Sequence, residues 1–180
     1  ALLMLAVMSC LLFSGCGGQS EQKKFVITYL PNESTDKNAD ARKGMAGDLS
    51  KVLGMEVTEL VSNDYNAVIE AMRTGKADMA YFGPLSFCLA YERAGAEPIG
   101  MIAKDKDKKN ATYKSVLVTS SKNTDINSIQ DIKGKTMAFV DPNSTSGNLI
   151  PSAAIMKAFP GEKLSMDDLH TNGKFFQAAS

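Results

Sequence analysis

Residues 138–147 read Ala-Phe-Val-Asp-Pro-Asn-Ser-Thr-Ser-Gly, which predicts the end of a buried strand, a polar turn and the start of a helix. In open α/β sheets, ligands bind beyond the carboxyl ends of the strands. The first turn of a helix offers unpaired N–H groups and the positive end of the helix dipole, which favour an anion. One hydroxyl is enough to cap a helix, whereas Ser144, Thr145 and Ser146 supply three, and Gly147 lets the backbone come close. The pattern fits plain capping and also a site for a small oxyanion.

Outside this stretch, strand-like and helix-like segments alternate. Short runs rich in β-branched and aromatic residues are bounded by turn residues, and apolar residues recur at helical spacing between them. This alternation predicts an α/β protein with mostly parallel sheets. The predicted strands are 25–30, 55–61, 78–82, 98–103, 113–119 and 135–140, and the predicted helices are 39–53, 67–72, 85–94 and 147–158, with a helical turn at 129–133.

The same alternation predicts two lobes. We expect a first α/β lobe over 24–119, a hinge or crossover at 120–123, and a partial second α/β lobe over 124–180. The second piece holds about one βα unit, and a segment below about 60 residues is marginal as a separate core. The chain stops at Ser180 just as an apolar segment begins. We therefore expect a C-terminally truncated fragment whose second lobe is incomplete and which does not fold stably alone.

The N-terminal residues carry an export pattern. Residues 1–15 are uncharged and apolar, as in the core of a signal peptide, and are too short to span a bilayer. The Leu-rich run followed by Ser14-Gly15-Cys16 resembles the bacterial lipoprotein processing site, where the cysteine is lipidated, although Phe13 replaces the usual Leu. Residues 16–23 would then be a lipid-anchored tether. The alternative is an ordinary buried helix. Without an initiator Met or a basic segment, the chain is expected to begin inside its signal.

The cysteines fit an exported lipoprotein. Cys10 would leave with the signal, Cys16 would carry the lipid, and Cys88 would remain alone, so no disulfide is expected in the mature chain. Cys88 lies in an apolar segment with no His, Asp or second Cys beside it. We predict a buried structural thiol there.

Composition excludes several classes of protein. The chain has 20 basic and 20 acidic side chains and is 44% hydrophobic, which argues against disorder and against a nucleic-acid module. Its one apolar run is too short for a polytopic membrane protein. We find no Ser-His-Asp arrangement, metal-ligand cluster or Gly-rich nucleotide loop, so we expect no enzyme, no metal and no cofactor. A small oxyanion remains possible, because hydroxyls and backbone dipoles do not enter a charge count.

Four segments in order carry a resemblance to a known family. They are Ser-Asn-Asp-Tyr at 62–65, Asp-Met-Ala-Tyr-Phe-Gly-Pro-Leu-Ser at 78–86, Tyr-Lys-Ser-Val-Leu-Val at 113–118, and the stretch 141–147. Through them the chain resembles, over nearly all of 24–170, the phosphonate-binding periplasmic proteins. These are the substrate-binding subunits of phosphonate- and phosphite-type ABC importers. The resemblance implies a two-lobed periplasmic-binding-protein-like fold of type II that closes on its ligand.

The resemblance also implies which residues meet the ligand. The three consecutive hydroxyl residues would hold the phosphonate oxygens at the helix N-terminus, and two tyrosines from the first lobe would line the cleft. The expected ligand-binding residues are Tyr65, Tyr113, Ser144, Thr145 and Ser146, and the further cleft-lining candidates are Phe82, Gly83, Asn143 and Gly147.

Other ligand contacts of the family are not matched. The family places a histidine on the phosphonate group, and some members use acidic groups on an amine. His170 follows 166–169 without the expected Gly-rich turn, so we predict that it is a loop residue. We expect the true counterparts to lie beyond Ser180.

The sequence thus predicts an extracytoplasmic solute-binding lipoprotein of an ABC importer. It would bind a phosphonate or similar small phosphorus oxyanion, be anchored by lipid at Cys16 to the outer face of the bacterial cell membrane or be periplasmic, and deliver its ligand to a permease. It would bind no nucleic acid and contact the membrane only through the lipid. The alternatives are the same fold serving another anion or a vitamin-like ligand, and a sensor domain of a receptor.

Overall fold

A computed structural model describes residues 23–103 and 105–180. The first part of the chain forms a three-stranded parallel sheet in the order β2-β1-β3. Its strands are β1 (Phe25–Tyr29), β2 (Val57–Leu60) and β3 (Met79–Tyr81). The central strand pairs in register with both neighbours, Phe25 opposite Val57 and Ile27 opposite Met79. The predicted α/β class with parallel strands is confirmed.

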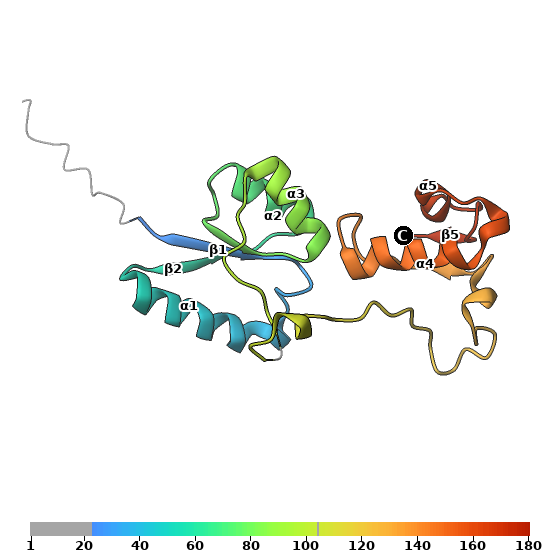
Figure 1. The fold of residues 1–180 in the computed structure, drawn as a ribbon, viewed down its shortest axis with the longest axis horizontal. Helices are drawn as coiled ribbons and strands as arrows, with labels where there is room; N and C mark the ends of the chain where they lie inside the picture. The colour runs from blue at the N-terminus through green and yellow to red at the C-terminus, as the bar shows by residue number, and fades with distance from the viewer. Residues whose placement is uncertain (1–22, 104) are drawn as a thin grey trace, which may run out of the picture.

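Three helices cover this sheet, with α1 on one side and α2 and α3 on the other (Figure 1). They are α1 (Ala39–Leu53), α2 (Tyr65–Arg73) and α3 (Pro84–Ala94). The start of α2 is capped by the Asp64 carboxylate, which accepts from the Ala67 N–H at 2.7 Å. Buried residues of α2 and α3 pack together with parts of the sheet. We call these strands and helices the first unit.

A second unit forms around a two-stranded parallel sheet of β4 (Thr136–Met137) and β5 (Ala178–Ala179). A π-helical turn, η4 (Thr145–Leu149), leads into α4 (Ile150–Ala158), and α5 (Met166–His170) follows. The short helical turn at Ile129–Ile132 also belongs here. The core of the second unit consists of Ile155, Leu169, Phe175 and Phe176.

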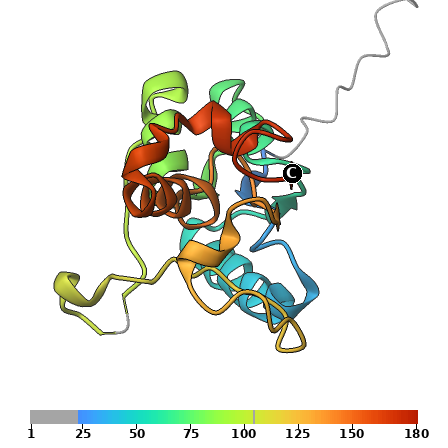
Figure 2. The same ribbon diagram turned by 90° about the vertical axis from the view of Figure 1, so that its right-hand side faces the viewer.

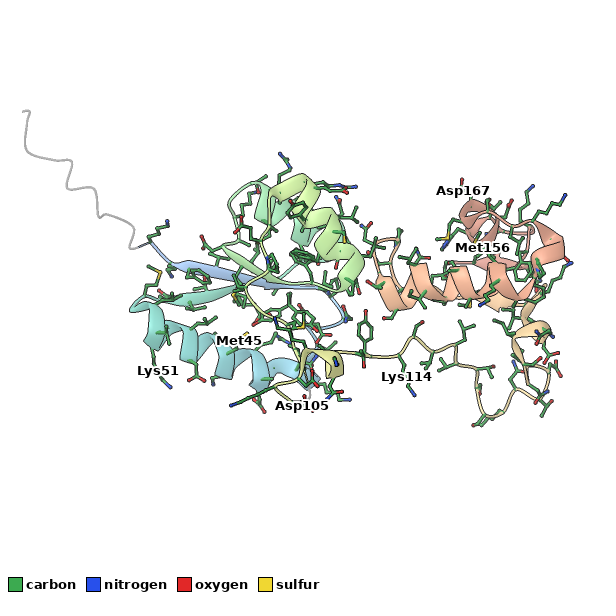
Figure 3. All side chains as sticks on the ribbon, viewed as in Figure 1. Met45, Lys51, Asp105, Lys114, Met156 and Asp167 are labelled. Atoms are coloured by element: carbon green, nitrogen blue, oxygen red, sulfur yellow. The ribbon has the colours of Figure 1, made fainter. Side chains whose placement is uncertain are left out.

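A segment over 111–128 that contains no helix or strand, and that turns at Ser121 and Lys122, runs from the first unit to the second (Figure 1). We call it the extended segment, and Lys114 lies on it in Figure 3. Figure 2 views the molecule with the second unit in front of the first. Two strands were predicted at 98–103 and 113–119, and neither forms within the described residues. Neither stretch has a partner strand among the described residues, and Val118 is 87% exposed. A strand needs a neighbour for its backbone bonds, which local β-propensity does not supply.

Two further predictions are wrong. Cys88 is exposed, because α3 turns Ser86 and Ala90 inward and places Cys88 on its opposite side. His170 is not a loop residue: it ends α5, and its ring lies 4.2 Å from that of Phe139. The helix predicted at 39–53 is confirmed, but none of its residues is buried, so its apolar positions do not enter the core.

The predicted signal segment, Cys16 and all of the predicted tether except its last residue, Lys23, lie outside the described residues. Within the described ranges, we find no helix with the length and apolar character needed to cross a membrane.

Candidate functional site

The loop after β4 is held by hydrogen bonds among its own residues and leads directly into a helix. Ser144 is the N-cap of η4, and its hydroxyl accepts from the Gly147 N–H at 3.1 Å. The Asp141 carboxylate accepts from the Asn143 N–H at 2.8 Å, and the Asp141 carbonyl accepts from the Ser144 N–H at 2.8 Å. Thr145 and Ser146 therefore occupy the first turn, where N–H groups have no partner within the helix. We call residues 141–147 the anion loop.

The base of the anion loop is tightly packed. A Cβ added at Gly147 would lie 2.3 Å from Val140 Cγ2, so no side chain fits there. Asn148 is buried and donates from its side-chain amide to the Pro142 carbonyl at 2.9 Å. Glycine is thus required at position 147, because the Val140 side chain lies against its Cα. The sequence alone does not reveal this contact.

The first unit meets the anion loop at the start of α3. The Leu85 N–H donates to the Thr145 hydroxyl oxygen at 2.8 Å. Ser86, fully buried, both accepts from the Gly83 N–H and donates to the Gly83 carbonyl, which holds the end of β3 in place. Since Thr145 accepts from Leu85, its own hydroxyl proton stays available to another acceptor.

A cavity of about 260 Å³ lies between the two units. Tyr113 reaches it from the extended segment and is 60% exposed, and the Ser115 hydroxyl donates to the Ser146 carbonyl at 2.7 Å. The Tyr113 hydroxyl and the Thr145 hydroxyl both lie within 4 Å of the position of a Gly83 Cβ. The cavity is lined by Pro84, Tyr113, Ser115, Thr145, Ser146 and Ile150.

Tyr65 lies beside the anion loop but is buried. It is 5% exposed, its hydroxyl donates to Asn32 Oδ1 at 2.9 Å, and its N–H donates to the Asp141 carboxylate at 3.4 Å. Burial raises the pKa of Tyr65 above 10; the Ser144 hydroxyl lowers it, and the charges of Asp141 and Glu33 raise it further. The tyrosine therefore stays neutral at physiological pH.

The remaining predicted residues are placed less directly. Phe82 packs against the core of the first unit and does not line the cavity. Gly83 adjoins the cavity through its neighbours, Thr145 and Tyr113. Asn143 is half-buried in the anion loop, where its N–H is bonded to Asp141.

The electrostatics of the site come from dipoles and hydroxyls. None of the described residues that line the cavity is charged. The described ranges contain no group of three or more His, Cys, Asp or Glu side chains placed to hold a metal ion. An oxyanion here would be held by neutral donors at a helix start, in a partly enclosed space where such bonds are stronger than in water.

Sequence reasoning missed several residues that shape the site. Four polar side chains hold groups at or near the site by hydrogen bonds. The groups are the Tyr65 hydroxyl, the Gly83 N–H, the Ser146 carbonyl and the Pro142 carbonyl, held respectively by Asn32, Ser86, Ser115 and Asn148. Ser115 and Ser86 lay inside segments already singled out, so their hydroxyls were a visible signal. Asn32 reaches Tyr65 across 33 residues of sequence, and nothing local indicates that contact.

Comparison with known proteins gives a consistent result. Residues 27–175 match the family described as "ABC transporter, phosphonate, periplasmic substrate-binding protein". The chain is 31% identical over 162 residues to a phosphate-import protein of Mycolicibacterium smegmatis, covering 84% of this chain and 50% of that protein. It is also 31% identical over 145 residues to a phosphonates-binding periplasmic protein of Escherichia coli, covering 78% and 42%.

A solved structure supports the fold. The binding-protein component of an ABC phosphonate transporter from Pseudomonas aeruginosa matches with a TM-score of 0.69 and 25% identity, over 88% of this chain and 50% of that chain. The likeness agrees with part of a two-lobed periplasmic-binding fold. This chain spans about half the length of the relatives it matches.

Proposed function

This chain belongs to the family of periplasmic substrate-binding proteins of phosphonate ABC transporters, and from that premise we propose that it binds a phosphonate or similar small phosphorus oxyanion in the cavity between its two units. The family consists of transport proteins and not of enzymes. The role is therefore capture and delivery, with no covalent step.

One observation carries the proposal: neutral donors from two separate parts of the chain, the anion loop and the extended segment, converge on one cavity. Ser146 comes from the anion loop, Thr145 is joined to the start of α3, and Tyr113 comes from the extended segment. A hydrogen bond to a charged group contributes about 1.5–3 kcal/mol. Three or four such bonds offset the costs of association and leave roughly micromolar affinity, about 8 kcal/mol.

In this proposal, the first and second units belong to two lobes that close on the ligand. The hydrogen bonds from Leu85 to Thr145 and from Tyr65 to Asp141 would then be part of the closed contact. An ABC permease would recognise the closed form.

We further propose that the protein is exported and held at the outer face of the membrane by a lipid on Cys16, with residues 16–23 as the tether.

Isothermal titration of the full-length protein with methylphosphonate, phosphite and phosphate tests the ligand class. We expect binding of at least one, and a loss of about tenfold or more in the Ser146→Ala variant, which removes one hydrogen bond to charge. Ser121→Ala, an exposed serine on the extended segment, is the matched control and keeps the affinity. If none of the three anions binds, the assignment is wrong.

The same titration separates the ligands. The names of the relatives include phosphate import as well as phosphonate binding, so inorganic phosphate is the specific competitor. If the protein binds phosphate more tightly than methylphosphonate, the proposed ligand becomes phosphate, bound at the same site.

A further inference from the structure

Ser115 fastens the extended segment to the anion loop. Within residues 112–119 it is half-buried, whereas the others are exposed. Its hydroxyl donates to the Ser146 carbonyl at 2.7 Å, and this is the one hydrogen bond that residues 112–119 make to another described residue. No strand forms there, so no backbone ladder fixes the register of the segment. Among hydrogen bonds, its register against the anion loop therefore depends on the Ser115 hydroxyl.

The Ser146 carbonyl needs this donor because its own helix does not supply one. In the π-helical turn η4 a carbonyl accepts from the N–H five residues later, and the Ile150 N–H accordingly donates to the Thr145 carbonyl. The corresponding partner of Ser146 is residue 151, a proline, which has no N–H. An unpaired carbonyl away from water costs free energy. The contact with Ser115 is thus favoured by the sequence of the helix itself.

The same contact decides where Tyr113 lies. Tyr113 and Ser115 both line the cavity, whereas Lys114 between them does not, as expected where alternate side chains point to opposite sides. The Tyr113 side chain is 60% exposed, and its hydroxyl makes no hydrogen bond to another described residue. The place of its ring in the cavity is therefore set by the backbone, which is held two residues away at Ser115.

The two hydroxyls differ in what they can offer a ligand. A hydroxyl has one proton to donate, and the proton of Ser115 goes to the Ser146 carbonyl. The remaining lone pairs of Ser115 can only accept, which does not suit a bare anion oxygen. The proton of Tyr113 has no acceptor among the described residues, so it is free for a ligand.

We propose that Ser115 is a positioning residue: its hydroxyl ties the extended segment to the anion loop and thereby holds the Tyr113 hydroxyl in the cavity as a donor to the bound oxyanion. This inference rests on the proposed function, since it requires an anion in that cavity. Ser115 thus strengthens binding without donating to the ligand, and its effect passes through Tyr113.

A double-mutant cycle on the full-length protein tests this. Titration calorimetry uses whichever of methylphosphonate, phosphite and phosphate the wild type binds most tightly. Tyr113→Phe removes the donor and should weaken binding about tenfold or more, the effect of one hydrogen bond to a charged group. Ser115→Ala leaves the ring unheld and should weaken binding about threefold to tenfold. The double variant should bind about as weakly as Tyr113→Phe alone, because the position of the ring no longer matters once its donor is gone.

Two further variants separate positioning from general structural support. Ser115→Thr keeps the hydroxyl and should bind within about twofold of the wild type. Thr119→Val removes an exposed hydroxyl from the same segment, outside the residues that line the cavity, and should bind like the wild type.

The outcomes that count against the inference are distinct from failure of the proposed function. Losses that multiply in the double variant would show that Ser115 acts independently of Tyr113. Wild-type affinity in either single variant would show that one of the two hydroxyls has no role. Each of these results overturns the inference and leaves the proposed function standing. If the wild type binds none of the three anions, the proposed function is wrong, and the inference falls with it.

Discussion

At the scale of single residues, two glycines next to the cavity have different physical roles. At Gly147 there is no space for a side chain, because an added Cβ would lie 2.3 Å from Val140 Cγ2. Gly83 has an extended backbone (φ −82°, ψ 172°), and an added Cβ would meet its nearest neighbour, the Thr145 hydroxyl, at 3.4 Å. The first glycine is required for packing, and the second leaves open the space where a ligand would sit.

Alanine at these positions should therefore separate stability from binding. Gly147→Ala is expected to lower the free energy of unfolding by about 1–3 kcal/mol, as overpacking does. Gly83→Ala should unfold like the wild type but bind methylphosphonate more weakly, because its methyl group enters the cavity beside Tyr113. Urea unfolding and titration calorimetry on the full-length protein measure both, and Gly161→Ala, at a glycine with open space around it, is the control. Equal stability of Gly147→Ala and the control would contradict the packing argument.

At the scale of elements, α5 depends on a carboxylate at its first turn. The Ser165 N–H and hydroxyl both donate to the Asp168 carboxylate, at 2.9 and 2.7 Å, and these bonds lower the pKa of Asp168 below its usual 3.8. A carboxyl whose pKa is lower in the folded state stabilises the fold above its unfolded pKa, and that stabilisation is lost as pH falls through the folded pKa.

We therefore expect Asp168→Asn to be less stable than the wild type at neutral pH, with the difference shrinking in acid as the pH falls through the lowered pKa of the folded-state Asp168 carboxyl. Urea unfolding at both pH values measures this difference. Asp167→Asn, one position earlier in the same helix, is the comparison. A difference that persists unchanged in acid would show that the charge of Asp168 is not its source.

The elements also show what the sequence can and cannot predict. The strands and helices from β1 to α3 were predicted nearly to their ends, because each has a local pattern and a local stop such as Asp64 or Gly54. The strands at 98–103 and 113–119 were predicted from composition, but pairing is a non-local property. Likewise, the hydroxyls of the anion loop are visible as consecutive letters, whereas the link from Asn32 to Tyr65 exists only once β1 and α2 pack together.

At the scale of the whole molecule, the two units are joined through the place where the ligand is proposed to bind. Leu85 and Ser115 each bond to the anion loop, at Thr145 and Ser146. A ligand held by both units should stabilise the folded protein as a whole. At a concentration one hundred times its Kd, the expected gain is about 2.7 kcal/mol.

Thermal or urea unfolding of the full-length protein with increasing methylphosphonate measures this gain. The free energy of unfolding should rise with the logarithm of ligand concentration, and Ser146→Ala should require a correspondingly higher concentration for the same rise. Unfolding curves that do not move with ligand would contradict binding to the native state at any site.

The stretches 98–103 and 113–119, which form no strand within the described residues, are open to pairing with another strand. Ile99, Val116 and Val118 are exposed on stretches that have no ladder partner among the described residues. Extended backbone with open hydrogen-bonding groups is a template for adding a strand from another chain. These two stretches are therefore the part of the described surface that can accept a further strand, from the same protein or from another molecule.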